Sequence, residues 1–563
     1  MSKIKSRTKG SKIKGKMGIT LPSFVVSVCV AIFSIAFFMA LPHTIYGVVF
    51  TVPAGNVDAL IKAIDAANAN DEGDIINLEA GTYNIMQINN NGTNGANGLP
   101  IITSSITITG AGAFTTIIQK GNRNEPFFRI IEVDFPGDLL IEGLTIRGGS
   151  VGCGNNEYFS CCGGGILNIN GRVGISHSII TDNGATCGGG IANSGGTVTI
   201  ENSSIAHNVS NDGGGILNED GTVIISSSSI DNNIAELSDP NEDGFFRSAG
   251  FGGGISNRSS DKGNQIATLD IINSSIVRNV AESTFDRGAS GGGIGNFSGR
   301  IKIINSTIAK NIAERERTKS DQSNGGGISN FFHYGEDTIF LQNTIIADNV
   351  ADRGPDCSGN GVESLGNNII SFLKFDECDI EFQPGDIIGT SGLGPLKNPG
   401  QPGRTHFPLM ENSFAIDAAN DDVCPATDQV DKPRRDTCDI GAIEFFPVIN
   451  HLVNLRKDEL VTKFDPTPVP GGPAGTFLIR SRFGNSSFRT IHNIFFEVIE
   501  LSEGNVLLNA DGGPGGVGST MTPQGSATTP FLPGDTGTFQ FKIGLLTRDI
   551  FQFSVNVLGE ADF

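Results

Sequence analysis

Residues 188–193 read Gly-Gly-Gly-Ile-Ala-Asn, and close copies of this hexapeptide recur along the chain. The copies begin at Gly163, Gly188, Gly213, Gly252, Gly291 and Gly325. A second signature, Ile-x-x-Asn, follows each copy and closes at Asn183, Asn208, Asn233, Asn279, Asn311 and Asn349. Short β-branched runs of period two, such as residues 197–200, lie between the signatures and predict strands. The first three hexapeptides are spaced 25 residues apart, so the chain is a repeat of short strands and turns.

A unit of this length cannot bury its own apolar side, so successive units must stack on one another. The chain lacks the leucine pattern of leucine-rich repeats, which disfavours that class of solenoid. A helical solenoid would need amphipathic segments with a period of 3.6 residues. We therefore expect an all-β protein built on a parallel β-helix. The isoleucine of each hexapeptide should form an inward column. The last residue of each hexapeptide should form a structural asparagine column, Asn168, Asn193, Asn218, Asn257, Asn296 and Asn330.

Composition excludes several classes of protein. The 76 glycines do not recur at every third position, which excludes collagen, and a hydrophobic content of 38% provides for an extended core. The net charge is −21, and beyond residue 17 there are 32 basic against 60 acidic residues. A body of this charge repels phosphate backbones, so nucleic acid is not an expected partner.

The amino-terminal segment predicts export. Seven bases and no acid occupy the first 17 residues, and an apolar run follows over residues 19–41. We interpret residues 1–47 as a signal peptide, the alternative being a membrane anchor through residues 19–41. Membrane contact is expected only through this segment. The protein is expected outside the cell or at its surface.

Eight cysteines beyond the apolar run agree with an oxidising compartment. Cys162 and Cys187 each precede a glycine triplet and are 25 residues apart, so a β-helix stacks them within disulfide range. We predict that they are bonded. Proximity in the sequence completes the set with the pairs Cys153 and Cys161, Cys357 and Cys378, and Cys424 and Cys438. Pairing of Cys161 with Cys187 is the alternative.

The repeats resemble those of polymorphic outer-membrane proteins and of related secreted bacterial right-handed β-helix proteins of the pectate-lyase-like superfold. Residues 56–64 and 78–83 resemble the amphipathic helical cap and first strand of that group. Residues 415–419, 424–429 and 438–444 resemble its closing module. The resemblance implies that the predicted β-helix is right-handed and forms one domain, with its cap module, over residues 48–447.

Residues 448–563 carry a different pattern. Proline and glycine cluster at residues 466–473, and four alternating apolar segments follow. These features predict a small immunoglobulin-like β-sandwich as an accessory domain. The segment is too short for a translocating membrane barrel, which sets the chain apart from full polymorphic outer-membrane proteins.

Insertions mark one corner of the predicted coil. The first two junctions between units hold four residues, whereas later ones grow to 18, 11 and 13 residues at 234–251, 280–290 and 312–324. Loops at one corner of a solenoid form a wall where ligands bind. The alternative is that this corner tolerates insertions that have no binding role. The candidate ligand-binding residues are Phe245, Phe246, Arg247, Phe285, Arg287, Arg315 and Arg317.

The sequence carries one candidate metal site, and no motif in it identifies a catalytic residue. Asp417, Asp421 and Asp422 belong to an acidic cluster, read either as a solvated cap held by Cys424 and Cys438 or as a calcium site. No motif calls for another cofactor. We expect a binding or adhesion protein for a polysaccharide or a surface protein. The alternative is a polysaccharide lyase or glycoside hydrolase acting on uronate-rich polymers beside the inserted loops.

Overall fold

The computed structural model describes residues 47–70, 72–121, 126–151, 158–237, 250–260, 265–283, 288–315, 322–331, 338–373, 377–435, 437–523 and 529–562. Residues 1–46 of the predicted signal peptide, which include the alternative anchor at 19–41, lie outside these residues. Among the described residues, no helix combines the length and apolar character needed to cross a membrane.

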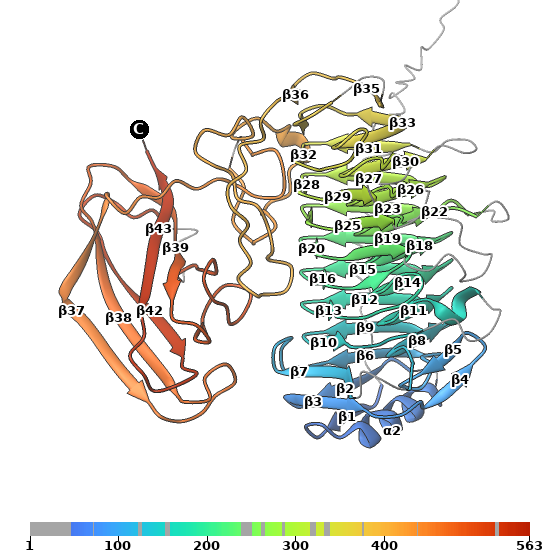
Figure 1. The fold of residues 1–563 in the computed structure, drawn as a ribbon. Coiled ribbons are helices and arrows are strands. Elements are labelled where there is room, and N and C mark those ends of the chain that lie inside the picture. The colour runs from blue at the N-terminus through green and yellow to red at the C-terminus, as the bar shows by residue number, and fades with distance from the viewer. Residues whose placement is uncertain are drawn as a thin grey trace, which may run out of the picture. The chain divides into compact units, whose positions relative to one another are not determined.

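A right-handed parallel β-helix forms the first part of the described chain, as predicted (Figure 1). Its largest sheet has 19 strands among the described residues. They are β1 Val49–Val52, β2 Asp74–Leu78, β6 Ser105–Thr109, β8 Ile131–Asp134, β9 Asp138–Glu142, β11 Ile166–Ile169, β12 Arg172–Ser176, β14 Ile191–Ser194, β15 Thr197–Glu201, β18 Ile216–Glu219, β19 Thr222–Ser226, β22 Ile255–Arg258, β23 Thr268–Ile272, β26 Ile294–Phe297, β27 Arg300–Ile304, β30 Ile328–Phe331, β31 Ile339–Gln342, β33 Cys357–Ser364 and β35 Cys378–Glu381.

Two further parallel sheets complete the coil within the described residues. One has 11 strands: β3 Gly81–Ile85, β7 Thr116–Lys120, β10 Thr145–Arg147, β13 Ile179–Thr181, β16 Ser204–Ala206, β20 Ser229–Asp231, β24 Ser275–Val277, β28 Thr307–Ala309, β32 Ile345–Ala347, β34 Ile369–Ile370 and β36 Ile387–Ile388. The other has four: β17 Val209–Ser210, β21 Ile234–Leu237, β25 Val280–Ser283 and β29 Ile312–Arg315. A hairpin of β4 Asn90–Gly92 and β5 Gly95–Asn97 and the short 3₁₀ helix η1 Tyr158–Cys161 lie outside these sheets.

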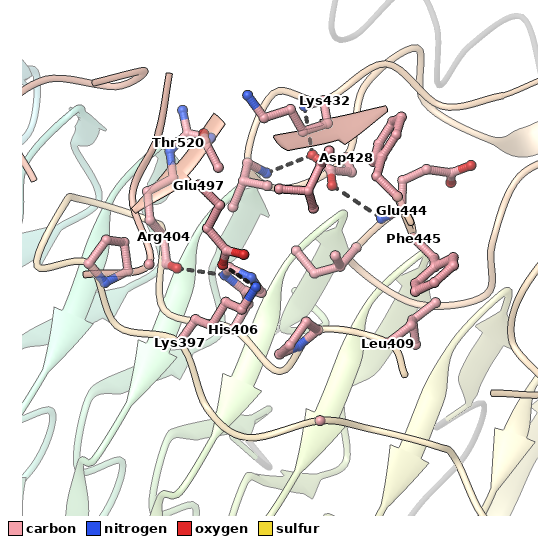
Figure 2. A pocket seen from close by; sticks show the side chains of 18 of the residues that line it. Lys397, Arg404, His406, Leu409, Asp428, Lys432, Glu444, Phe445, Glu497 and Thr520 are labelled. Carbon is pink, nitrogen blue, oxygen red and sulfur yellow. Dashed lines mark hydrogen bonds and ion pairs between the residues drawn. The ribbon is translucent and has the colours of Figure 1, made fainter. Parts of the chain in front are cut away.

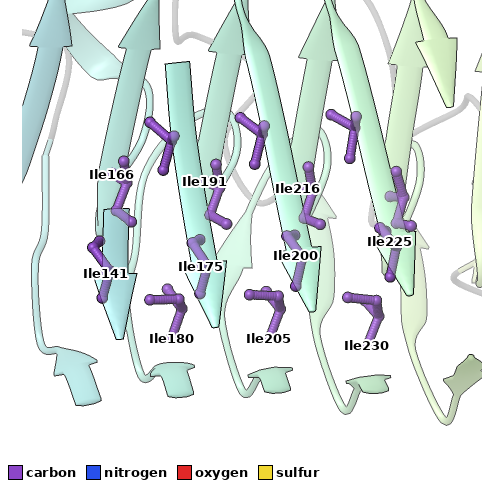
Figure 3. Close-up of a cluster of buried hydrophobic side chains, with 14 of the residues drawn as sticks. Ile141, Ile166, Ile175, Ile180, Ile191, Ile200, Ile205, Ile216, Ile225 and Ile230 are labelled. Atoms are coloured by element: carbon purple, nitrogen blue, oxygen red, sulfur yellow. The ribbon is translucent and has the colours of Figure 1, made fainter. Parts of the chain in front are cut away.

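Isoleucine columns fill the interior of the coil. Ile166, Ile191 and Ile216 occupy equivalent positions on successive rungs and are fully buried, and their side chains follow one another along the stack (Figure 3). Columns through Ile175 and Ile180 run beside them. Each rung therefore buries its apolar face only because the next rung covers it, as the repeat length requires.

The three glycines of each hexapeptide have different steric roles. Gly188 has a φ of 59°, a conformation that favours glycine. A Cβ on Gly189 would lie 2.6 Å from the carbonyl oxygen of Gly214, and one on Gly190 would lie 2.8 Å from that of Gly215. The first glycine makes the turn, and the other two let adjacent rungs approach.

The structural asparagine column is a hydrogen-bonded ladder. Nδ2 of Asn168 donates to Oδ1 of Asn193 at 2.7 Å, and four further steps of 2.8 Å lead to Asn330. A second ladder, not predicted as such, joins the closing asparagines from Asn183 to Asn349, where Asn349 donates to Asp356. Both ladders give buried amides the partners that they need.

A helix covers the first rung, as the amphipathic pattern predicts (Figure 1). Helix α2, Val57–Asn68, is capped by Asn56, whose side chain accepts a hydrogen bond from the backbone of Ala59 at 3.0 Å. Its buried face includes Leu60 and Ile64, which join the core of the solenoid.

Three disulfides are confirmed. Cys162 and Cys187 are bonded with their Cα atoms 4.6 Å apart, Cys357 pairs with Cys378, and Cys424 pairs with Cys438. Cys161 is also disulfide-bonded, which excludes its pairing with Cys187. Its predicted partner, Cys153, lies outside the described residues.

Residues 391–446, which we call the strap, follow the last rungs and contain the short helix η2 Asp421–Val423. The strap contacts the outer side of the 11-stranded sheet: the backbone of Gly403 donates to Ser204, and Ser275 donates to Gln429. Its Phe407 packs on Val277 and Ala309. The predicted closing module thus lies along the flank of several rungs.

Residues 449–561 form an antiparallel sandwich around their own core. One sheet contains β37 Val453–Asp465, β38 Thr476–Asn485, β42 Thr536–Gly544 and β40 Val506–Leu507. The other contains β41 Thr520–Met521, β39 Ile491–Leu501 and β43 Phe553–Ala561. Phenylalanines dominate the contact between the sheets, with Phe496 touching Phe483, Phe539 and Phe541.

Candidate functional site

The last residues of the short strands form a column on the outer face of the solenoid. The register places Ser194, Glu219, Arg258, Phe297 and Phe331 on adjacent strands β14, β18, β22, β26 and β30. We call these five residues the outer column. Each is the last residue of its strand, follows three buried residues and is itself at least partly exposed. Because each lies three positions after the inward-pointing isoleucine of its strand, it faces away from the core.

Two carboxylates meet one guanidinium in this column. Nη1 of Arg258 lies 2.6 Å from Oδ2 of Asp212, and Nη2 lies 3.3 Å from Oε2 of Glu219. The side chain of Asp212 is 2% exposed, whereas those of Glu219 and Arg258 are 16% and 18% exposed. We call these three residues the charged triad. Only Glu219 and Arg258 reach the surface.

Burial dominates the electrostatics of the charged triad. Burial raises the pKa of Asp212 to about 7. Burial, with the charges of Asp220 and Asp212, raises the pKa of Glu219 to about 8. Burial lowers the pKa of Arg258 to about 10, which still leaves the guanidinium charged at neutral pH. The triad thus joins a cation to two carboxyl groups that titrate near neutrality.

Aromatic rings continue the outer column beyond the charged triad. Phe331 is 39% exposed, and its ring centroid lies 5.7 Å from that of Phe251. Gly295 makes room for Phe251, because a Cβ there would lie 2.7 Å from the ring. One face therefore offers an aromatic surface and charged hydrogen-bonding groups side by side.

The charged triad was absent from the sequence prediction, although a signal for it existed. Asp212 precedes its glycine triplet as Cys162 and Cys187 do. Glu219 and Arg258 each follow the asparagine of their hexapeptide. The alignment that predicted the disulfide therefore also aligns these residues.

A cavity of about 300 Å³ lies between the strap and the sandwich (Figure 2). Lys397 of the strap pairs with Glu497 of β39, and Asp428 accepts hydrogen bonds from the backbone of Lys432 and Glu444. Burial lowers the pKa of His406 to about 4, so this histidine is neutral at neutral pH. The ion pair of Lys397 and Glu497 thus joins the strap to the sandwich, whereas Asp428 holds the backbone of the strap itself.

Six of the seven candidate ligand-binding residues lie outside the described part of the chain. Phe245, Phe246, Arg247, Phe285, Arg287 and Arg317 lie outside the described residues. Arg315 ends β29, and its Nε lies 2.9 Å from Oδ2 of Asp352. Although partial burial opposes the shift, hydrogen bonds from Arg315 and Ser323 hold the pKa of Asp352 below its ordinary value.

Two of the three residues of the predicted acidic cluster are engaged with protein groups. Asp417 lies 3.0 Å from Nη2 of Arg435, and Oδ1 of Asp421 accepts a hydrogen bond from the backbone of Cys438. Asp421, Cys424 and Cys438 come within 4.8 Å of one another, but both sulfurs belong to a disulfide. Asp422 is exposed. Calcium binding here stays a prediction.

The fold defines the class as a parallel β-helix solenoid protein. No protein-family model matches the chain, and no curated protein matches it. Among solved structures, the chain is similar to ORF18 of Geobacillus virus E2, with 10% identity over 90% of this chain and 80% of that one. The TM-score is 0.21, which is too low to support any statement about function.

Proposed function

We propose that this chain is an exported β-helix protein that binds a polysaccharide through its outer column, in an adhesive role at the cell surface or outside the cell. The observation that carries the proposal is the continuity of Glu219, Arg258, Phe297 and Phe331 on four adjacent strands. The insertions predicted as a wall arise next to the same rungs.

The chemistry of the outer column suits a sugar chain. A sugar ring has apolar C–H faces and a rim of hydroxyl groups. Phenylalanine rings pack on the faces, while a carboxylate and a guanidinium hydrogen-bond the rim. Strands repeat at about 4.8 Å along a stack, so a column presents contacts in a line, which an extended polymer follows better than a compact ligand does.

Export is supported by the disulfides and by the amino-terminal pattern. Disulfides persist in oxidising compartments, and three are present among the described residues. The basic and apolar segments of residues 1–41 suit a secretion signal. We also propose that the repeats are related to those of polymorphic outer-membrane proteins and of the pectate-lyase-like superfold. The sandwich is proposed to be immunoglobulin-like.

A glycan array probed with the purified full chain tests the function. We expect binding to a subset of polysaccharides and loss of that binding in Phe331→Ala. Binding to surface proteins alone, with every polysaccharide inert, would refute the choice of ligand.

A polysaccharide lyase or glycoside hydrolase is the second candidate, and the charged triad favours it. A catalytic acid works best with a pKa near the operating pH, and Asp212 and Glu219 have such values. Because Asp212 is almost fully buried, only Glu219 could reach a substrate. Incubation with uronate polymers, with and without calcium, should release unsaturated or reducing ends from the wild type and not from Glu219→Gln if this candidate holds.

A further inference from the structure

A buried lysine of the strap points at a carboxyl group of the sandwich. Nζ of Lys432 lies 2.6 Å from Oδ2 of Asp511, and the lysine side chain is 4% exposed. The ammonium also lies 4.4 Å from the ring centroid of Phe495 on β39. The lysine therefore has little contact with water, whereas the side chain of Asp511 is 23% exposed, and the two residues are 79 positions apart in the sequence.

Two threonines surround the carboxyl group of Asp511. The backbone N–H of Thr522 donates to Oδ1 at 2.9 Å, and the hydroxyl of Thr520 lies 3.0 Å from Oδ2. The hydroxyl of Thr522 lies 2.8 Å from both Oδ2 of Asp511 and Nζ of Lys432. One oxygen is thus held by an amide that would stabilise a developing oxyanion, while a hydroxyl bridges the amine and the other oxygen.

We propose that Lys432 and Asp511 form an isopeptide bond that links the strap covalently to the sandwich. The geometry brings together a nucleophile, an electrophilic carbon, an oxyanion donor and a proton relay around a buried amine. Holding reacting groups in contact removes the entropic barrier of bringing them together.

The reaction balances without a co-reactant. Lys432 first gives a proton to Oδ2 through the Thr522 hydroxyl, which leaves a neutral amine and a carboxylic acid. Nζ then attacks Cγ, the Cγ–Oδ2 bond breaks, and a second proton from Nζ leaves with Oδ2 as water. The product is an amide between Nζ and Cγ, and no group is oxidised or reduced.

Electrostatics make the reaction slow but feasible. Burial lowers the pKa of Lys432, which favours the neutral amine. Although burial opposes the shift, Lys432 and Thr522 hold the pKa of Asp511 below its ordinary value. The resting state is therefore an ion pair, and the reactive neutral pair is its minor form.

Intact-mass measurement of the purified, reduced full chain tests the proposal after the protein has been kept at neutral pH for several days. We expect a mass below that of the sequence by one water molecule, and a peptide map in which the segments holding Lys432 and Asp511 are joined. Lys432→Arg keeps the positive charge and should show the full mass. Thr522→Val should slow the loss of water.

Lys397→Arg is the matched control, because Lys397 makes a second ion pair between the strap and the sandwich. This variant should lose water as the wild type does. A reduced wild type that keeps its full mass, with both peptides unlinked, overturns the proposal even if no variant folds.

Discussion

The side-chain amide of Asn193 donates a 2.8 Å hydrogen bond to the side-chain oxygen of Asn218, one rung further along the solenoid. The same amide donates to the backbone carbonyl of Gly196 at 3.0 Å, and both asparagines are buried. The ladder thus links rungs to one another and to the turns that follow each short strand.

Removal of one step of this ladder should destabilise the fold. Asn193→Ala leaves the oxygen of Asn218 and the carbonyl of Gly196 without this donor, and an unmet buried group costs about 1–3 kcal/mol. Urea unfolding of the full chain measures the loss. Asn211→Ala, at a partly exposed position on a nearby turn, is the control. Equal losses in the two variants would contradict a structural role for the ladder.

Close stacking of the glycine triplets predicts a larger effect. A Cβ on Gly189 would lie 2.5 Å from the carbonyl oxygen of Val209, so neighbouring backbone must move. We expect Gly189→Ala to lower the free energy of unfolding by about 3 kcal/mol or more. Gly516→Ala adds a Cβ that meets no atom within 4 Å and should change little. A tolerated Gly189→Ala would show that the rungs are less tightly stacked.

The disulfide between Cys162 and Cys187 should stabilise the chain even though the rungs already pair. It closes a loop of 25 residues, and such links contribute about 2–4 kcal/mol. The double variant Cys162→Ser and Cys187→Ser should therefore unfold at a lower temperature by calorimetry under oxidising conditions. Under reducing conditions the difference from the wild type should shrink, and a difference that persists unchanged would assign the effect to packing.

The pKa of Asp212 predicts how stability depends on pH. The native carboxyl titrates at about 7 and the ordinary value is 3.8, so between these values the native state holds a proton that the unfolded chain has lost. Stability should therefore fall as the pH rises through this window, by up to about 4 kcal/mol before the attraction of Arg258 offsets part of it. Asp212→Asn should make this fall less steep in urea titrations, with Glu219 still contributing to it, while Asp549→Asn, at an exposed position, should leave the profile unchanged. A wild-type stability that rises over this window would contradict the burial argument.

The sequence predicted those features that depend on register. The bond between Cys162 and Cys187 follows from equal positions before two glycine triplets, and the first asparagine ladder follows in the same way. The charged triad obeys the same register, but the insertion at residues 234–251 sets Arg258 at 46 residues from Asp212 and hides the relation.

The docking of the strap on the outer side of the 11-stranded sheet could not be predicted by this means. Gly403 contacts Ser204 across 199 residues, and Gln429 contacts Ser275 across 154. These are single polar contacts between a non-repeating segment and the outer side of a sheet, and no periodic pattern in the sequence encodes them. The ion pair between Lys432 and Asp511 depends on the same docking, so no sequence pattern predicts it either.

The central claim is that the outer column binds a polysaccharide, and titration calorimetry with two phenylalanine variants tests it most directly. Phe331 belongs to the outer column, whereas Phe488 is fully exposed in the sandwich. With a polysaccharide that binds the wild type, Phe331→Ala should weaken the affinity about tenfold or more, as expected for an aromatic anchor. Phe488→Ala should leave the affinity unchanged. Equal affinities for wild type and Phe331→Ala would contradict the account.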